Sequence, residues 1–379
     1  MKKIYTFLIL FLVSILLACK ATNKEDISEP EINEPPASQE IDKYPWEKDR
    51  ESLLASNDLV LIYGGGAHRD VTWNKDHFKP YVTYRDESGK EHWLFDGFLF
   101  LEIVDGHKKI FATGYNGTPA TKVEWKALAD YYFASDNAIL ALNQCVGEAI
   151  TRLGKPVEKR KIVIGMPEPI SSLTNWGQAD GKTLNFSNTS DRIAACVWYI
   201  DYVREHFDKA GIQNLELAGF YWIAEESNHT RDILSQISEY LNDRMYAFNW
   251  IPYWNAPGYN EWKALDFNYA YLQPNYFFNE NIPYSRLDDA CRAANSYNMD
   301  LELEFDMRAF VGNGNRGSRL YDYMNAFRQN GMLEKKRIAY YQDCDALYSF
   351  SKATDQQDIK LYHDFNRFVL EHIQKYNGK

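Results

Sequence analysis

The sequence lacks the usual motifs of nucleotide-binding, metal-binding and nucleic-acid-binding proteins. Its 379 residues include only five cysteines, and no CxxC pair or histidine at ligand spacing points to zinc. Basic residues are outnumbered by acidic ones, 42 to 53, and the net charge of −11 argues against a nucleic-acid backbone as partner. The glycines at 64–66 do not form GxGxxG, and neither a P-loop nor a GxSxG elbow occurs. We therefore expect no cofactor, no metal and no nucleic-acid partner.

The first 19 residues have the order of a bacterial lipoprotein signal. Two lysines precede an apolar stretch at 4–17, which is short for a membrane span. Residues 16–19 (LLAC) then resemble the lipobox, which implies cleavage before Cys19 and attachment of a lipid to its sulfur. We therefore expect residues 1–18 to be a signal peptide. The alternatives for this segment are a plain signal peptide and a buried helix.

The segment that follows is polar, acidic and Pro-rich. Residues 19–45 predict a flexible tether between the lipid and a folded domain at 46–379. Within the tether, KED at 24–26 resembles the surface-export signals of Bacteroidetes lipoproteins. The expected location is membrane-anchored, at the outer membrane, on the cell surface or the periplasmic face. Four further cysteines lie far apart in apolar segments, so we expect buried free thiols rather than disulfides: Cys145, Cys196, Cys291 and Cys344.

From residue 58 onward, apolar runs bounded by turn residues alternate with amphipathic helical stretches. Eight such runs predict one α/β domain, a (β/α)8 TIM barrel, rather than an open doubly wound sheet, which usually has a Gly-rich first turn. The predicted strands are 58–64, 94–101, 160–166, 215–223, 245–251, 267–273, 299–306 and 337–342. The predicted helices are 122–153 and about 190–210, 230–242, 285–297, 318–331 and 356–376.

One predicted strand carries three acids on a single face. Glu302, Glu304 and Asp306 alternate with apolar residues in 299–306. Because successive side chains point to opposite faces, the acids must point into the barrel if the apolar residues meet the helices. Active sites of such barrels lie at the C-terminal ends of the strands. We therefore expect Glu304 and Asp306 near the mouth of the barrel and Glu302 deeper.

A second pair of acids, Glu225 and Glu226, follows the fourth predicted strand. In a retaining glycosidase, one carboxyl protonates the leaving oxygen and the other attacks the anomeric carbon. The placement on strands four and seven resembles the large clan of retaining (β/α)8 glycoside hydrolases, which implies Glu225 or Glu226 as acid/base and Glu304 as nucleophile. That clan usually has Asn where this sequence has Ala224. Asp306 is a further catalytic candidate, and Glu226 alternatively serves only to open the next helix.

The other predicted strand ends are rich in aromatic, amide and charged side chains. Aromatic residues reach 15%, more than a core needs. Trp and Tyr rings stack on the C–H face of a pyranose, while amides and carboxylates bond to hydroxyls, so we expect a carbohydrate ligand. The candidate substrate-binding residues are Tyr63, His68, Arg69, Glu102, Glu168, Trp222, Asn249, Tyr253, Trp254, Gln273, Asn275, Tyr276, Tyr341 and Asp343.

Several motifs together resemble a bacterial family known only as domain of unknown function 4855. They are GGAHRD at 65–70, WLFDGFLFL at 93–101, GFYW at 219–222 with Glu225 after it, QPNY at 273–276 and LELEFD at 301–306. The resemblance covers about residues 55–375 and implies a glycoside-hydrolase-like barrel. It names no substrate, so the chemistry depends on the site itself.

The main alternative to a glycoside hydrolase is a glycan-binding surface lipoprotein that keeps the barrel without turnover. Acids on both strand four and strand seven favour the enzyme. Ser/His/Asp hydrolysis lacks support, because the eight histidines form no clear motif. A hard-cation site of Glu102, Glu304 and Asp306 is a further alternative. The sequence leaves the sugar and its linkage open.

Overall fold

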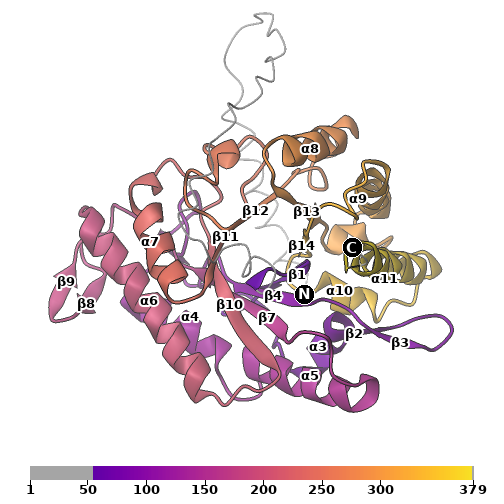
Figure 1. The fold of residues 1–379 in the computed structure, drawn as a ribbon, viewed down its shortest axis with the longest axis horizontal. Coiled ribbons are helices and arrows are strands. Elements are labelled where there is room, and N and C mark those ends of the chain that lie inside the picture. The colour runs from indigo at the N-terminus through magenta and orange to yellow at the C-terminus, as the bar shows by residue number, and fades with distance from the viewer. Residues whose placement is uncertain (1–53, 378–379) are drawn as a thin grey trace, which may run out of the picture. The chain divides into compact units, whose positions relative to one another are not determined.

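Eight parallel strands close into a barrel in the computed structural model, which describes residues 54–377 (Figure 1). Strands that follow one another in the chain are neighbours in the barrel, and β1 pairs with β14 to close it, with Asp58 opposite Ile338. The barrel strands are β1 (Asp58–Tyr63), β4 (Gly97–Leu101), β7 (Arg160–Met166), β10 (Leu215–Trp222), β11 (Ala247–Trp250), β12 (Tyr269–Leu272), β13 (Asp300–Glu304) and β14 (Ile338–Tyr341). All eight predicted strands, and with them the TIM barrel, are confirmed.

Helices surround the barrel on its outside (Figure 1). They are α3 (Lys75–Val82), α4 (Lys122–Tyr132), α5 (Ala138–Leu153), α6 (Thr189–Lys209), α7 (Arg231–Asp243), α8 (Ser285–Ser296), α9 (Gly317–Gln329), α10 (Ala346–Phe350) and α11 (Gln356–Asn377). The five predicted helices from about residue 190 onward are confirmed within two residues at each end. The crossover from β11 to β12 departs from the pattern, because it contains only the short 3₁₀ turn η1 (Tyr259–Glu261).

The single helix predicted for 122–153 is wrong, because two helices occupy this range. Helix α4 ends at Tyr132 and α5 begins at Ala138. Between them Asp136 has a φ of 55°, and Ala138 has a φ of 40°. Left-handed backbone at these positions interrupts a right-handed helix. The apolar spacing continues across the break because both helices pack on the same barrel, so periodicity alone did not reveal it.

On β10 the alternation of side chains is shifted by a bulge. The register with β7 slips between Leu217 and Gly219. A Cβ on Gly219 would lie only 2.3 Å from the carbonyl oxygen of Ala247 on β11, so the close approach of the two strands requires glycine here. Beyond the bulge, Tyr221 faces the barrel interior and Trp222 faces the opposite way.

A buried polar cluster lies at the N-terminal end of the barrel. The carboxylate of Asp58 accepts hydrogen bonds of 2.7 Å from the Tyr340 hydroxyl and from Nδ1 of His372. The other ring nitrogen of His372 lies 2.9 Å from the carbonyl oxygen of Lys336. Burial lowers the pKa of His372, but the charge and hydrogen bond of Asp58 outweigh it and raise the pKa overall. The cluster ties α11 to β1 and β14, at the end of such barrels that serves stability.

Three two-stranded ribbons lie in the connections between barrel strands. They are β2 (Thr83–Arg85) with β3 (Glu91–Trp93), β5 (Lys109–Ile110) with β6 (Thr118–Pro119), and β8 (Gly177–Ala179) with β9 (Lys182–Leu184). The second follows β4 and the third follows β7, so both extend from the C-terminal ends of barrel strands.

The cysteines of the described region are free, as expected: Cys145, Cys196 and Cys291 are buried and Cys344 is half-buried. None of the helices within residues 54–377 is long and apolar enough to cross a membrane. The predicted signal peptide, Cys19 and the tether lie outside the described residues, so those assignments stay predictions.

Candidate functional site

Glu304 closes β13 and is held by donors from two other elements. Its side chain is 1% exposed. Oε2 accepts a hydrogen bond of 2.7 Å from the backbone N–H of Asn275 and another from the hydroxyl of Tyr323 on α9. Asn275 follows β12 with a φ of 51°, a left-handed conformation that asparagine tolerates. The carboxyl group is therefore fixed in one orientation, as a reacting group must be.

Two amide side chains connect Glu304 to Glu225. Nδ2 of Asn275 lies 3.4 Å from Oε1 of Glu304 and donates to Oε1 of Gln273 at 3.2 Å. Gln273 in turn forms a hydrogen bond with the carboxyl group of Glu225, just beyond the end of β10. Nε2 of Gln273 also donates to the carbonyl oxygen of Ile251 at 2.8 Å, which fixes the amide. The acids that follow β10 and close β13 therefore lie on one side of the barrel mouth, joined by a chain of hydrogen bonds.

Burial raises the pKa of both carboxyl groups. For Glu304 burial is the largest cause, the charge of Glu225 adds to it, and the donors Tyr323 and Asn275 act against it, which leaves a pKa of about 7. Burial also raises the pKa of Glu225, against the hydrogen bond from Gln273. Two interacting carboxyls with raised pKa values hold a proton near neutral pH, so the pair offers one acid and one carboxylate.

Glu302 lies two residues earlier on the same face of β13, deeper in the barrel. It is 2% exposed, and its Oε1 has no hydrogen-bond partner within residues 54–377. Burial, and then the charges of Glu304 and Glu225, raise the pKa of Glu302 well above its ordinary value. Burial and the neighbouring charges therefore favour the protonated form of Glu302, which lies deeper in the barrel than Glu304.

The other two predicted catalytic acids are engaged in local contacts. Glu226 accepts a hydrogen bond of 2.8 Å from the backbone N–H of Asn228, in the turn before α7. Asp306 accepts a hydrogen bond of 2.7 Å from the backbone N–H of Arg308 and forms an ion pair with its guanidinium group. Since these contacts occupy both acids, Glu225 and Glu304 are the stronger catalytic candidates.

A second charged cluster lies at the ends of β1, β4 and β14. Arg69 forms two hydrogen bonds of 2.8 Å with the fully buried Glu102 and lies 3.7 Å from Asp343. The guanidinium carbon of Arg69 also lies 5.0 Å from the ring centre of Tyr63, which packs edge-on against Tyr341 with ring centres 5.7 Å apart. Five predicted binding residues thus come together in one wall of the mouth.

The structure gives no support to the cation site considered above. Within residues 54–377, no group of three or more His, Cys, Asp or Glu side chains is arranged to hold a metal ion. Glu102 is paired with Arg69, and Asp306 is paired with Arg308.

Four further predicted residues lie around the mouth at different depths. Tyr253 is half-buried, and after burial the charges of Glu226 and Glu225 raise its pKa. Trp254 is also half-buried, and its backbone N–H donates to Oδ1 of Asn275 at 3.1 Å. The other two are the exposed His68 and the buried Glu168.

Three predicted binding residues are almost fully buried, and one of them, Trp222, faces away from the barrel interior, which corrects its assignment. Trp222 packs against Phe248 on the face of β10 opposite Tyr221. Asn249 is 4% exposed, lies opposite Tyr221 on the interior face and donates to a backbone carbonyl of β10, and its binding role stays a prediction. Tyr276 is 3% exposed, and its hydroxyl is bound to α9. The bulge on β10 explains why Trp222 lies on the face opposite Tyr221, because it reverses the alternation counted from the start of the strand.

Sequence reasoning missed three tyrosines that surround the acids. Tyr323 donates to Glu304 from α9. Burial, and then the charge of Glu225, raise the pKa of Tyr221 inside the barrel and of Tyr115 in the loop between β5 and β6. Strand alternation after the bulge would have indicated Tyr221, but no local pattern signals the other two.

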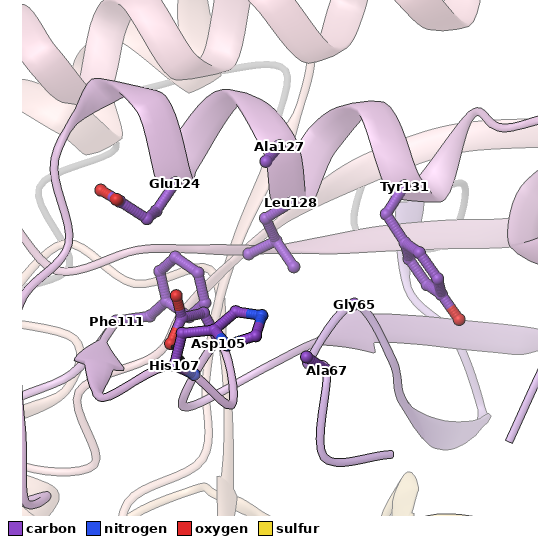
Figure 2. Close-up of a pocket in the computed structure, with 10 residues that line it drawn as sticks. Gly65, Ala67, Asp105, His107, Phe111, Glu124, Ala127, Leu128 and Tyr131 are labelled. Carbon is purple, nitrogen blue, oxygen red and sulfur yellow. Dashed lines mark hydrogen bonds between the residues drawn. The ribbon is translucent and has the colours of Figure 1, made fainter. Parts of the chain in front are cut away.

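A separate pocket of about 290 Å³ opens beside the mouth (Figure 2). Leu128 and Tyr131 of α4 form one side, and Gly65, Phe111 and His107 lie opposite them in the loops after β1 and β4 (Figure 2). The Glu225–Glu304 pair does not line it.

Comparisons with known proteins give a family match and weak structural similarities. A family model described as a domain of unknown function (DUF4855) matches residues 58–367. Among solved structures, the catalytic domain of a family GH18 chitinase from the fern Peteris ryukyuensis is 11% identical with a TM-score of 0.43, covering 83% of this chain and 99% of that one. A mutant tryptophan synthase α-subunit from Pyrococcus furiosus is 9% identical with a TM-score of 0.37, covering 86% and 99%. No curated protein sequence matches significantly. Similarities this low concern the barrel fold and indicate no activity.

Proposed function

The chain belongs to the DUF4855 family, whose description names no activity, and from the geometry of its own carboxyl groups we propose that it is a glycoside hydrolase with Glu225 and Glu304 as its catalytic pair. The observation that carries the proposal is the chain of hydrogen bonds from Glu225 through Gln273 and Asn275 to Glu304. Glycoside hydrolysis by two carboxyl groups needs such a pair facing one bond from two sides.

The mechanism that we propose is a retaining one, in which the two carboxyls must lie about 5–5.5 Å apart, closer than in inverting enzymes. The charge of Glu225 adds to the rise in the pKa of Glu304, so the two carboxyl groups lie within electrostatic reach of each other. Glu225, bound through Gln273 and partly exposed, would protonate the glycosidic oxygen. Glu304 would attack the anomeric carbon, and Glu225 would then remove a proton from the water that releases the sugar.

The contacts of Glu304 support the role of nucleophile. The hydroxyl of Tyr323 and the N–H of Asn275 both stabilise its ionised form. Because the pKa of Glu304 is about 7 in the free protein, kcat/KM should rise with pH around neutrality as this carboxyl loses its proton.

The test is incubation of the protein with a panel of plant, host and microbial polysaccharides, with products read by mass spectrometry. We expect sugar release by the wild type and a loss of at least about 10³-fold in Glu225→Gln and Glu304→Gln. Glu216→Gln is the matched control, since Glu216 is an exposed acid near the start of β10. Release by Glu304→Gln at the wild-type rate would remove Glu304 from the mechanism. Binding without release on every substrate would leave the glycan-binding alternative.

Azide assigns the two roles. In a retaining enzyme without its acid/base, azide attacks the glycosyl-enzyme and gives a glycosyl azide of the substrate's anomeric configuration. Without the nucleophile, azide attacks the substrate directly and gives the opposite configuration. We expect the retained product from Glu225→Ala and the inverted product from Glu304→Ala, each read by proton NMR.

We also propose that a lipid on Cys19 anchors the protein to the outer membrane. The order of charged start, apolar stretch and lipobox supports it. Labelled palmitate should enter the wild type and not Cys19→Ser, and labelling of both would contradict the proposal.

A further inference from the structure

The loop between β5 and β6 follows β4, at the end of the barrel where the active sites of such barrels lie. Its stem is fixed because the backbone N–H of Thr118 donates to the carbonyl of Lys108 at 2.8 Å, and β5 pairs with β6. Its tip, residues 113–118, is exposed to solvent and carries Tyr115, which is 37% exposed. Few large side chains of the described residues are this exposed, and this one lies at the functional end of the barrel.

Tyr115 lies two residues after Thr113, which is bound to Glu168 just after β7, and β7 is the neighbour of β10, after which Glu225 follows. An ionised Tyr115 would raise the pKa values of Tyr63, Tyr221 and Tyr341 in the barrel wall, which agrees with a place beside the mouth. Burial of its hydroxyl raises the pKa of Tyr115, and the charge of Glu225 adds to the effect. Since more than a third of the side chain is still open to solvent, part of the ring is available to a ligand beside Glu225.

A buried carboxylate holds this loop in place. Glu168, just after β7, is 4% exposed. Its two oxygens accept hydrogen bonds from the backbone N–H of Thr113 at 2.6 Å and from the Thr113 hydroxyl at 2.8 Å. The N–H of Glu168 donates to the carbonyl of Phe111 at 2.8 Å. Two hydrogen bonds at Thr113 and one at Phe111 thus fix the backbone just before Tyr115, so this part of the loop is held before any ligand arrives.

We propose that Tyr115 is the stacking platform of a sugar-binding subsite next to Glu225, and that Glu168 positions this platform through Thr113. The ligand is a pyranose within an oligosaccharide. The aromatic ring stacks on the C–H face of the sugar, while the neighbouring carboxyl and tyrosine hydroxyl groups form hydrogen bonds with the sugar hydroxyls. The choice of a sugar as ligand rests on the proposed function.

Calorimetry of the full chain with linear hexasaccharides of glucose, xylose, mannose and N-acetylglucosamine tests the platform. The Glu304→Gln background prevents turnover during the titration. For the tightest hexasaccharide, we expect Tyr115→Ala to weaken binding about tenfold and Tyr115→Phe to bind within about twofold of the parent. Tyr240→Ala is the matched control, because Tyr240 is a partly exposed tyrosine on the outer helix α7.

A double-mutant cycle tests the positioning role. Glu168→Ala should weaken the same hexasaccharide as much as Tyr115→Ala, and the double variant should bind no more weakly than Tyr115→Ala alone. Full additivity of the two changes would overturn the role of Glu168. Unchanged binding by Tyr115→Ala, or no binding of any hexasaccharide by the parent, would overturn the platform. Because binding is read without catalysis, failure of the hydrolase proposal leaves this result intact.

Discussion

Replacing Glu304 by glutamine should stabilise the protein at neutral and alkaline pH. The side chain is 1% exposed, and burial is the main reason why its pKa rises from the ordinary value of 4.5 to about 7. In the unfolded chain this carboxyl ionises near its ordinary value, whereas the folded protein still holds the proton. The stability that Glu304 contributes is therefore complete below about pH 4.5 and is lost as the pH rises through about 7.

The size of the effect follows from the shift in pKa. One pH unit corresponds to about 1.4 kcal/mol, so a shift from 4.5 to about 7 costs about 3 kcal/mol of unfolding free energy once Glu304 is ionised in both states. Glutamine is neutral at every pH and keeps an oxygen that can accept the hydrogen bonds from Asn275 and Tyr323. Its advantage over wild type should grow from near zero at pH 4 to about 3 kcal/mol at pH 8.

Urea unfolding, followed by tryptophan fluorescence at pH 4, 6 and 8, measures this difference. Glu216→Gln, at an exposed position of the same charge, should show no pH-dependent gain. A Glu304→Gln protein that is less stable than wild type at pH 8, or whose difference from wild type is the same at all three pH values, would refute the reasoning. The result does not depend on a substrate, so it examines the electrostatics of the site independently of the proposed activity.

Three other predictions concern contacts around the barrel. His372→Gln should lower the free energy of unfolding by about 3 kcal/mol below pH 6.5, because it leaves Asp58 buried without its charged partner. This loss should shrink as the pH rises through the raised pKa of His372, and urea unfolding measures it. Tyr323→Phe should raise the pKa of Glu304 by about one unit, since a donor to the carboxylate is lost, read by a carbon-13 NMR titration. Gly219→Ala should lower the melting temperature, because its Cβ would lie 2.3 Å from a carbonyl of β11; an unchanged melting curve by circular dichroism contradicts that contact.

The strands were predictable because strands of a parallel barrel are buried on both faces and read as apolar runs between turns. Strand β13 showed its alternation directly, since Glu302 and Glu304 interrupt leucines at every second position. The break between α4 and α5 was missed because apolar spacing persisted across it. Asp136 and Asn137 are nevertheless residues that favour a turn, and they mark this break in the sequence.

The site was predictable only as far as it follows from strand ends. Glu225 and Glu304 could be placed together because the C-terminal ends of parallel strands meet at one mouth. Tyr323 and Tyr115 reach these acids from a helix and a loop, and such contacts arise from tertiary packing that no local spacing encodes. Trp222 was chosen because it ends a strand, and its face could not be foreseen because a single bulged residue reverses the faces of the residues after it.

The placement of three carboxyl groups at the centre of the barrel is better explained by function than by stability. Glu225, Glu302 and Glu304 form no ion pair with another residue of the described chain, and burial raises the pKa of each. A leucine in place of Glu302 would remove a costly polar group whose Oε1 has no partner. The barrel stabilises Arg69, by contrast, with a full bidentate pair. Three acids close together at the mouth of the barrel are held in a state that stability alone disfavours, and the proposed proton transfer to a bound ligand is a chemistry that such a state serves.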